Sequence, residues 1–187
     1  MPNNADKVVI GQSGALYFAP VGTAGPTDLT TALAVAWIDS GFLSEDGVTL
    51  DPSVEFNEVA AWQSRYPIRR YEASRSFDIS FAMMEMGKAN FILSMGGGAM
   101  ATTGVSPNQV HTYTPPTAGT VDERAFVVEW VDGTKKYRLH APKGLVTDFA
   151  EINVSRTDPA MLDVTVSVLS TDGVASFTIL SNDAAWV

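Results

Sequence analysis

The chain has 187 residues and a mass of 20.0 kDa, which suits one domain and leaves little room for two. With 45% hydrophobic and 18% charged residues it is too apolar for an intrinsically disordered protein. The net charge of -9 disfavours tight, unassisted binding to DNA, and the absence of cysteine excludes disulfides, cysteine zinc sites and thiol nucleophiles.

Residues 1–7 show neither the basic nor the apolar segment of a secretory signal. The longest apolar stretch, residues 32–38, is far shorter than the ~20 residues that span a bilayer. We therefore expect a single domain over residues 1–187 that is synthesised in a cytoplasm and does not insert into a membrane.

Alternation of apolar and polar residues dominates the sequence and predicts a mainly β fold. The pattern is clearest at Leu162, Val164 and Val166, which predict a strand with one face on a core and the other on water or a partner. Turn-forming Gly, Pro, Asp and Ser separate the predicted strands. In chain order these strands cover residues 14–19, 37–43, 54–62, 68–73, 77–83, 146–154, 162–168 and 174–180.

A β-hairpin is predicted between residues 126 and 139, because Asp132-Gly133 suits the positive φ angles of a type I′ turn. Residues 22–26 and 101–107 are predicted to be loops.

One helix is predicted over residues 88–95, where Phe91 and Met95 stand one turn apart and three glycines follow. A short helical turn is predicted over residues 28–34, with Thr27 as its cap.

The sequence shows no arrangement typical of a catalytic or metal site. His111 and His140 lack metal-ligand spacing and are predicted to be surface strand residues. Adjacent carboxylates at 45–46 and 122–123 lie in turn-like segments, where solvation is the common reason for acids. Because no nucleophile, base and orienting group occur together, we expect no cofactor, and an enzyme ranks last among the functional classes.

Residues 42–75 combine opposite charges with an aromatic residue. Tryptophan and arginine are enriched in protein–protein hot spots, so this segment is a candidate contact between copies. The alternative is a twisted hairpin with a solvated, salt-bridged surface. The candidate contact residues are Glu45, Asp46, Asp51, Trp62, Gln63, Arg65, Arg69 and Arg70.

Charge is unevenly distributed along the chain. Residues 1–64 carry a net charge of -7, residues 65–143 carry +3 and residues 144–187 carry -5. Complementary potentials steer and register association, so the basic middle of one copy is predicted to dock onto the acidic ends of another. Ordinary surface scatter is the alternative.

Several segments match a known family in order and spacing. They are residues 14–23 (GALYFAPVGT), 26–28 (PTD) and 41–49 (GFLSEDGVT), and then Ala61-Trp62-Gln63 with Ile68-Arg69. Through them the chain resembles the major tail tube proteins of long-tailed, siphovirus-type bacteriophages, particularly those that infect actinobacteria. The later part agrees through the hairpin at 126–139, a turn at 142–144 and closing strands around 158–159 and 164–169.

The resemblance implies a phage tail-tube type β-sandwich or barrel with one flanking α-helix, at residues 88–95. In this family six copies join inner strands into a ring-wide β-barrel, and rings stack into the tube through which the genome is delivered. The resemblance also implies that residues 44–75 connect to a neighbouring subunit or ring. Acids at Glu45, Asp46 and Asp51 of one copy would then meet Arg65, Arg69 or Arg70 of another.

The partners implied are further copies of the chain, the tape measure protein, the tail terminator and the distal tail proteins. The implied location is the virion tail, after assembly in the host cytoplasm. DNA is expected to pass through the lumen without specific binding, and we expect lumen-lining strands to carry more acid than base because carboxylates repel phosphates.

The main alternative is a carbohydrate-binding or adhesive β-sandwich module. In that case Trp37, Trp62, Trp130 and Tyr137 would form a stacking platform for sugar rings.

Overall fold

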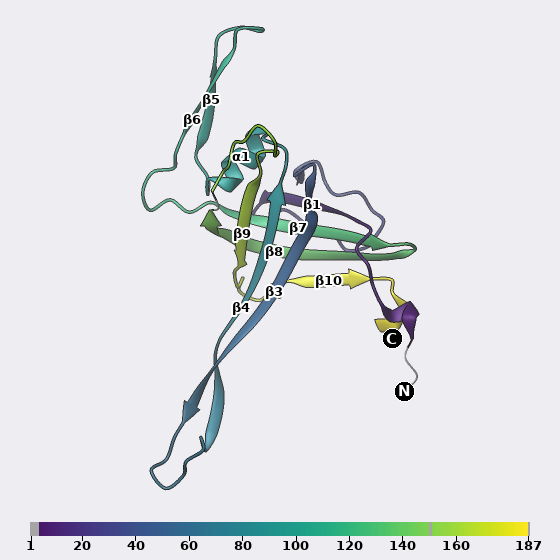
Figure 1. Cartoon of the computed structure of the whole chain (residues 1–187), viewed down its shortest axis with the longest axis vertical. Coiled ribbons are helices and arrows are strands. Elements are labelled where there is room, and N and C mark those ends of the chain that lie inside the picture. Colours follow the sequence, from purple (N-terminus) through teal and green to yellow (C-terminus); the bar gives the residue numbers. More distant parts are fainter. Residues whose placement is uncertain (1–3, 150, 187) are drawn as a thin grey trace.

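The computed structural model describes residues 4–149 and 151–186, which form one eight-stranded antiparallel sheet, a separate hairpin and one helix (Figure 1). The order in the large sheet is β2-β1-β7-β8-β9-β4-β3, with β10 also paired with β8. The elements are η1 (Ala5–Lys7), β1 (Ser13–Pro20), β2 (Ile38–Asp39), β3 (Leu43–Val59), β4 (Arg69–Met83), α1 (Lys88–Ser94), β5 (Ala99–Thr103), β6 (Val110–Thr114), β7 (Glu123–Asp132), β8 (Lys135–Phe149), β9 (Leu162–Val168), β10 (Thr178–Ser181) and η2 (Ala184–Trp186).

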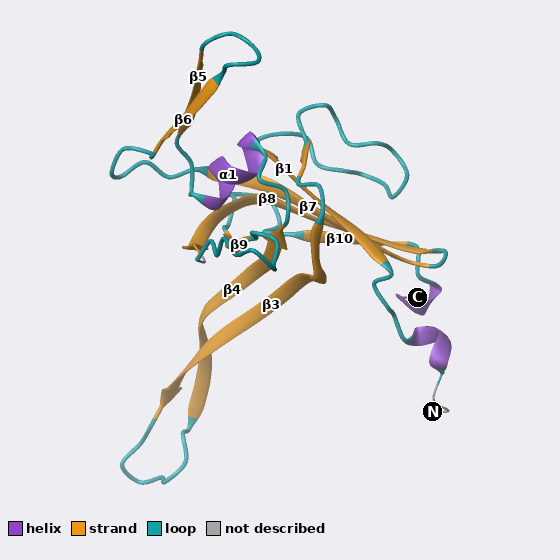
Figure 2. Cartoon of the chain, turned by 45° about the horizontal axis from the view of Figure 1, so that its top comes forward, coloured by secondary structure: helices purple, strands orange, loops and turns teal. Residues whose placement is uncertain are grey.

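The large sheet forms two layers because β8 belongs to both. The first half of β8 pairs with β7 and β10, and its second half pairs with β9. In Figure 2, β1, β7 and β10 run across the direction of β3 and β4. The predicted mainly β sandwich is therefore confirmed, with β1, β7 and the start of β8 behind a front layer in the order β8-β9-β4-β3.

The bend in β8 lies at residues 142–144, where the sequence predicts a turn. The strand continues through this segment; the register shift against β7 at Arg124/Phe126 falls on it, and the shift against β9 at Val146/Asp148 follows it. Such bulges bend a strand without ending it. A Cβ at Gly144 would lie 2.7 Å from Cγ1 of Val166, so a larger residue there would have to displace that side chain.

The core fills the space between the two layers. Ile79 and Phe81 of β4 and Val166 of β9 face it, as their alternation predicts, and each is at most 5% exposed. Burying each such side chain stabilises the fold by about 1.5–3 kcal/mol. The rear layer contributes Leu16, Phe18, Phe126, Val128 and Leu139.

Several predicted strand boundaries are wrong. The stretches predicted at 68–73 and 77–83 are one strand, β4, because the polar residues between them continue the ladder with β3. The stretch at 54–62 is the end of β3, and that at 37–43 contains only β2 and the first residue of β3. The strand predicted at 146–154 ends at Phe149, and the last strand is β10.

The predicted helix is confirmed as α1, which ends before Gly96, a residue in the left-handed conformation with φ of 67°. Asn90 is 5% exposed, and its side-chain amide donates hydrogen bonds to the carbonyl oxygens of Ser40 (2.8 Å) and Glu85 (2.9 Å). The Glu85 carboxylate in turn accepts from the backbone N–H of Phe42 at 3.0 Å. These bonds attach the helix to the segment that leads into β3.

The described loop at residues 21–37 contains no helix, so the predicted helical turn is wrong. The carboxylate of Asp28, not Thr27, accepts hydrogen bonds from the backbone N–H groups of Thr30 (2.7 Å) and Thr31 (2.6 Å). This is an Asx-type turn, which satisfies the same donors without a helix. Arg138 donates to the carbonyl oxygens of Asp28 (2.7 Å) and Thr31 (3.1 Å), which holds the loop on β8.

Trp37 and His140 attach the same loop to the rear layer. The Trp37 indole is 7% exposed, donates to the carbonyl oxygen of Ala24 at 3.1 Å and meets the His140 ring edge-on, 5.9 Å between centroids. The surface position predicted for His140 is wrong, because its imidazole is partly buried and this burial lowers its pKa. His111 lies exposed on β6, as predicted.

The predicted loop at 101–107 is partly strand, since β5 extends to Thr103. The β5–β6 hairpin projects from the sandwich at the end opposite the β3–β4 pair (Figure 1).

Candidate assembly surface

The β3–β4 pair continues beyond the core as a two-stranded arm, residues 51–76 (Figures 1 and 2). The residues of β4 that precede Asp78 pair with β3 alone, because the ladder between β4 and β9 ends at Asp78. Every arm residue except Ala61 is exposed. A two-stranded ribbon without a packed face is at best marginally stable in water, so the arm gains little stability from packing within the subunit.

Apolar side chains follow the arm to its tip. On β3, Leu50 lies opposite Ile79 and Pro52 opposite Phe77, so Val54 and the next apolar residue, Phe56, continue the core-facing row into solvent. The exposed fractions are 38% for Val54 and 57% for Phe56. The connecting loop, residues 60–68, adds fully exposed Trp62 together with Gln63, Tyr66 and Ile68.

The arm is basic at its tip and charge-paired along its strands. Arg70 forms an ion pair with Glu58, and Arg75 forms one with Glu72 at 3.0 Å, which lowers the pKa of that carboxyl group. Residues 60–69 contain two arginines and no acid. Within the described residues neither Arg65 nor Arg69 has an ion-pair partner, so the arm's unpaired arginines lie at its tip.

A groove with a volume of about 600 Å³ opens at the other end of β3. It lies between the start of β3, the start of β1 and the end of β7. Its acids are Glu45, Asp46 and Glu129, of which Glu129 is bonded to Arg138 at 2.7 Å. Its apolar lining consists of Phe42, Leu43, Val48, Leu50, Val128 and Trp130.

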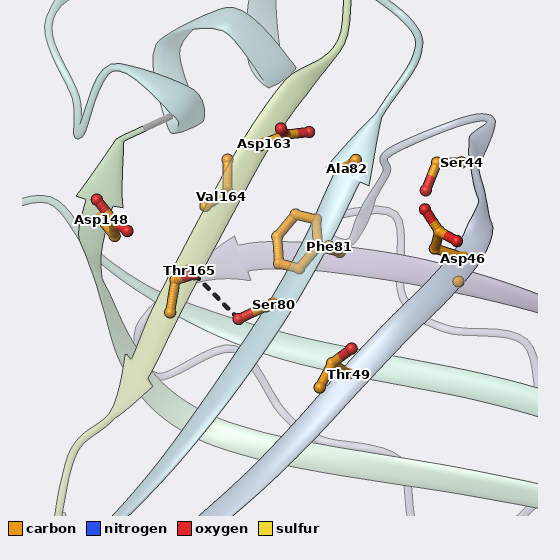
Figure 3. Close-up of a pocket in the computed structure, with 11 residues that line it drawn as sticks. Ser44, Asp46, Thr49, Ser80, Phe81, Ala82, Asp148, Asp163, Val164 and Thr165 are labelled. Atoms are coloured by element: carbon orange, nitrogen blue, oxygen red, sulfur yellow. Dashed lines mark hydrogen bonds between the residues drawn. The ribbon is translucent and has the colours of Figure 1, made fainter. Parts of the chain in front are cut away.

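The outer side of the front layer is polar and acidic; we call it the acidic face. Figure 3 shows Asp46, Asp148 and Asp163 around a hollow of about 260 Å³ whose lining contains no basic residue. The hydroxyls of Ser80 and Thr165 are hydrogen-bonded across it at 3.0 Å. The residues that define the acidic face are Asp46, Thr49, Asp51, Asp78, Ser80, Thr147, Asp148, Asp163, Thr165 and Ser167.

The acidic face concentrates like charge at a cost to the free chain. Asp51 lies directly opposite Asp78 in the β3–β4 ladder, an arrangement that is destabilising for two carboxylates. The Ser167 hydroxyl donates to Asp78 and offsets part of this cost.

Two edges of the front layer are open among the described strands. One edge is β3, which is 17 residues long and pairs only with β4. The other edge is residues 146–149 of β8, which pair only with β9 because β7 begins at Glu123, opposite Leu145. Open edges present unpaired N–H and C=O groups that template pairing with another chain.

A single chain does not bring the predicted contact residues together. Glu45 and Asp46 lie at the groove, Asp51 lies on the acidic face, and Trp62, Gln63, Arg65, Arg69 and Arg70 lie towards the far end of the arm. The sequence interpretation missed the acids of the face on β4, β8 and β9. Their signal is an acid at an outward position between two core residues, as for Asp78 and Asp163.

The aromatic platform predicted for a carbohydrate-binding module is wrong. Trp130 and Tyr137 stack with ring centroids 5.1 Å apart, but Trp37 is buried against His140 and Trp62 lies at the tip of the arm. The four rings therefore share no surface.

Across residues 4–149 and 151–186, no three His, Cys, Asp or Glu side chains are grouped as metal ligands would be. None of the described helices is long and apolar enough to span a membrane.

Comparison with known proteins identifies the family of the chain. No curated protein sequence matches the chain. The family model described as "Phage tail tube protein" matches residues 1–187, the whole chain. That family consists of structural tail components of the virion, which fits a mainly β chain with open sheet edges among its described strands. The chain therefore belongs to the phage tail tube protein family.

Proposed function

We propose that six copies close into a ring by joining the two open edges of the front layer, β3 of one copy against residues 146–149 of the next. The observation that carries this proposal is that one four-stranded layer ends in an open edge on both sides. Since neighbouring strands alternate in direction, β3 of one copy runs antiparallel to β8 of its neighbour. Six copies of four strands then give a closed antiparallel barrel of 24 strands in which the two open edges of the front layer are paired, while the arm extends beyond it.

The acidic face lines the lumen in this ring. The other side of the front layer is covered by β1, β7 and the core, so only the acidic face is free to point inward. Carboxylates there repel DNA phosphates over the ~10 Å screening length at moderate salt. The genome therefore passes without binding, and the tape measure protein occupies the same channel before ejection.

Stacked rings form the tube of a long-tailed, siphovirus-type phage in this proposal, with an actinobacterial host. The support is the resemblance of residues 14–23 and 41–49 to the tail tube proteins of such phages. The tail terminator and the distal tail proteins then bind the two ends of the tube, where a ring has no further copy to stack on.

Cysteine cross-linking tests the proposed ring, because the chain has no cysteine of its own. Thr49 on β3 and Thr147 on β8 are both exposed on the acidic face, next to the two edges. In assembled particles of the Thr49→Cys/Thr147→Cys variant, oxidation should give covalent species from dimer to closed hexamer. Moving the β3 cysteine from position 49 to position 51 or 53, as Asp51→Cys or Ser53→Cys together with Thr147→Cys, scans the register between copies.

The control for this experiment is Thr49→Cys/Thr112→Cys, which moves the second cysteine to the exposed strand β6. It should give no ladder on a denaturing gel. Ladders that continue beyond six subunits would exclude a closed ring of six, and the absence of cross-links at every β3 position would exclude the β3–β8 edge contact.

A further inference from the structure

We infer that the groove at the start of β3 receives residues 151–156 of the neighbouring copy in the same ring, with Val154 seated on its apolar lining. The inference rests on the proposed ring, and it adds to the pairing of β3 with β8 a side-chain contact between the same two copies. Three features carry it: the place of the two segments in the front layer, the exposed side chains of residues 151–156 and the lining of the groove.

The groove and the segment that follows β8 lie at the same end of the front layer. Phe149, the last residue of β8, lies opposite Val164 of β9, and Val164 lies opposite Phe81 of β4. Phe81 in turn lies opposite Val48 of β3. Figure 3 shows the middle of this row, Val164 and Phe81. Since β8 ends at the row and β3 begins beside it, residues 151–156 and the groove lie beyond the row on the same side.

The proposed ring places residues 151–156 of the next copy beside the groove. The groove opens between β3, the last strand of the front layer, and the rear strands β1 and β7, so it lies at the edge that the next copy covers. β8 of that copy is antiparallel to β3 and therefore runs towards the start of β3. Val154 lies five residues after Phe149, a reach of about 16 Å at ~3.3 Å per residue. This reach accommodates a stagger of a few residues between copies, which a closed barrel requires.

The segment after β8 carries an apolar side chain that its own subunit does not cover. Alternation in the sequence predicts a strand up to residue 154, whereas β8 of the subunit ends at Phe149. Ile152 packs against the core of its own subunit, but Val154, two residues further on, is 78% exposed. Burial of Val154 therefore has to come from another molecule.

The groove offers Val154 an apolar seat. Its volume of about 600 Å³ is in the range of pockets that enclose a small ligand, ~300–1,000 Å³, so it admits a short segment of chain. Val128 and Trp130 of β7 form part of its apolar lining, and Val48 and Leu50 of β3 form another part.

Arg156 complements the acids of the groove. Glu45 and Asp46 lie where β3 departs from its ladder with β4. Neither these acids nor Arg156 has an ion-pair partner within the described residues. Arg156 follows Val154 by two residues, so seating Val154 in the groove brings the guanidinium close to the two carboxylates. Opposite charges across an interface orient the encounter and fix its register.

Cysteine cross-linking reads this contact separately from the edge pairing. Ser13→Cys/Val154→Cys joins the β1 side of the groove to the segment after β8, and both residues are exposed in the subunit. Oxidation of assembled particles should give covalent species from dimer to closed hexamer, as for Thr49→Cys/Thr147→Cys. A mixture of Ser13→Cys and Val154→Cys chains should give covalent dimers, which distinguishes a bond between copies from one within a chain.

The matched control is Ser13→Cys/Val105→Cys. It moves the second cysteine to a residue that is 81% exposed between β5 and β6, and it should give no ladder.

Charge reversal tests the pairing of Arg156 with the groove. In the Ser13→Cys/Val154→Cys background, Arg156→Glu should slow disulfide formation between copies by at least about tenfold. Adding Glu45→Lys/Asp46→Lys to that chain should restore the rate. Lys136→Glu is the control, because Lys136 is also exposed and has no ion-pair partner within the described residues, and it should leave the rate unchanged.

Three results would overturn the inference and leave the ring intact. The first is a ladder from Thr49→Cys/Thr147→Cys without one from Ser13→Cys/Val154→Cys. The second is a Ser13→Cys/Val154→Cys ladder that continues beyond six subunits, which would place the contact between rings. The third is an equal rate in Arg156→Glu and Lys136→Glu. Absence of cross-links at every β3 position would instead refute the proposed ring and the inference with it.

Discussion

Buried polar side chains fix the segments that frame the assembly surface. Asn90 is the clearest case, since its amide bonds the carbonyl oxygens of Ser40 and Glu85 on both sides of the entry to β3. Removing it leaves two acceptors without a donor in a buried place, which costs about 1–3 kcal/mol.

Asn90→Ala should therefore lower the free energy of unfolding of the free subunit by about 1–3 kcal/mol in urea titrations. The matched control is Asn57→Ala on the exposed arm, which should change it by less than about 0.5 kcal/mol. Equal effects of the two substitutions would contradict the role assigned to Asn90.

His140 makes the loop at residues 21–37 sensitive to pH. Burial lowers its pKa in the folded chain, whereas in the unfolded chain it titrates near ~6.5. As the pH falls through that value, the unfolded chain binds the proton before the folded chain does. The free energy of unfolding therefore decreases below about pH 6.5, and the contribution of the neutral His140 is fully present above that pH.

Amide hydrogen exchange of residues 24–34, corrected for intrinsic rates, should thus show faster opening at pH 5 than at pH 7. His140→Gln should remove most of this pH dependence, and His111→Gln, at the exposed imidazole of β6, should leave it unchanged. A pH dependence that survives His140→Gln would assign it to another group.

At the scale of elements, the arm is separate from the core that stabilises the subunit. The fold was predictable from sequence wherever one strand face is buried, as for residues 77–83 and 162–168, because burial imposes alternation. The arm has no buried face, so the polar run Ser74–Ser76 resembles a turn although it continues β4. The bend of β8 near Gly144 likewise resembles a turn in the sequence, since register shifts against β7 and β9 bend the strand without ending it.

Shortening the arm should leave the subunit stable. Val59 and Arg69 are paired opposite each other, so Asn-Gly in place of residues 60–68 closes the ladder with a two-residue turn. The Tm of the free subunit should shift by less than about 2 °C, because the removed residues touch no core.

Phe77→Ala is the contrasting variant, because Phe77 stacks on Phe177 with ring centroids 4.0 Å apart at the root of the arm. It should lower the Tm by about 6–20 °C, the equivalent of roughly 3–5 kcal/mol. If the shortened arm destabilised the subunit as much as Phe77→Ala does, the arm would be part of the folding core.

At the scale of the whole molecule, charged side chains are grouped by their location in the fold more than by their position in the sequence. The division into acidic ends and a basic middle indicates complementary surfaces, and the structure places Glu45 and Asp46 at the groove and Arg65 at the arm tip. It also shows a second group of acids whose common position the sequence does not reveal. Asp78, Asp148 and Asp163 lie on three strands, and only their register gathers them on one face.

A cryo-EM reconstruction of the assembled tube tests the central claim most directly. It should show six copies per ring, β3 hydrogen-bonded to residues 146–149 of the neighbouring copy, and the acidic face on the inner wall. A tube in which this face points outward, or whose inner wall is net basic, would contradict the account.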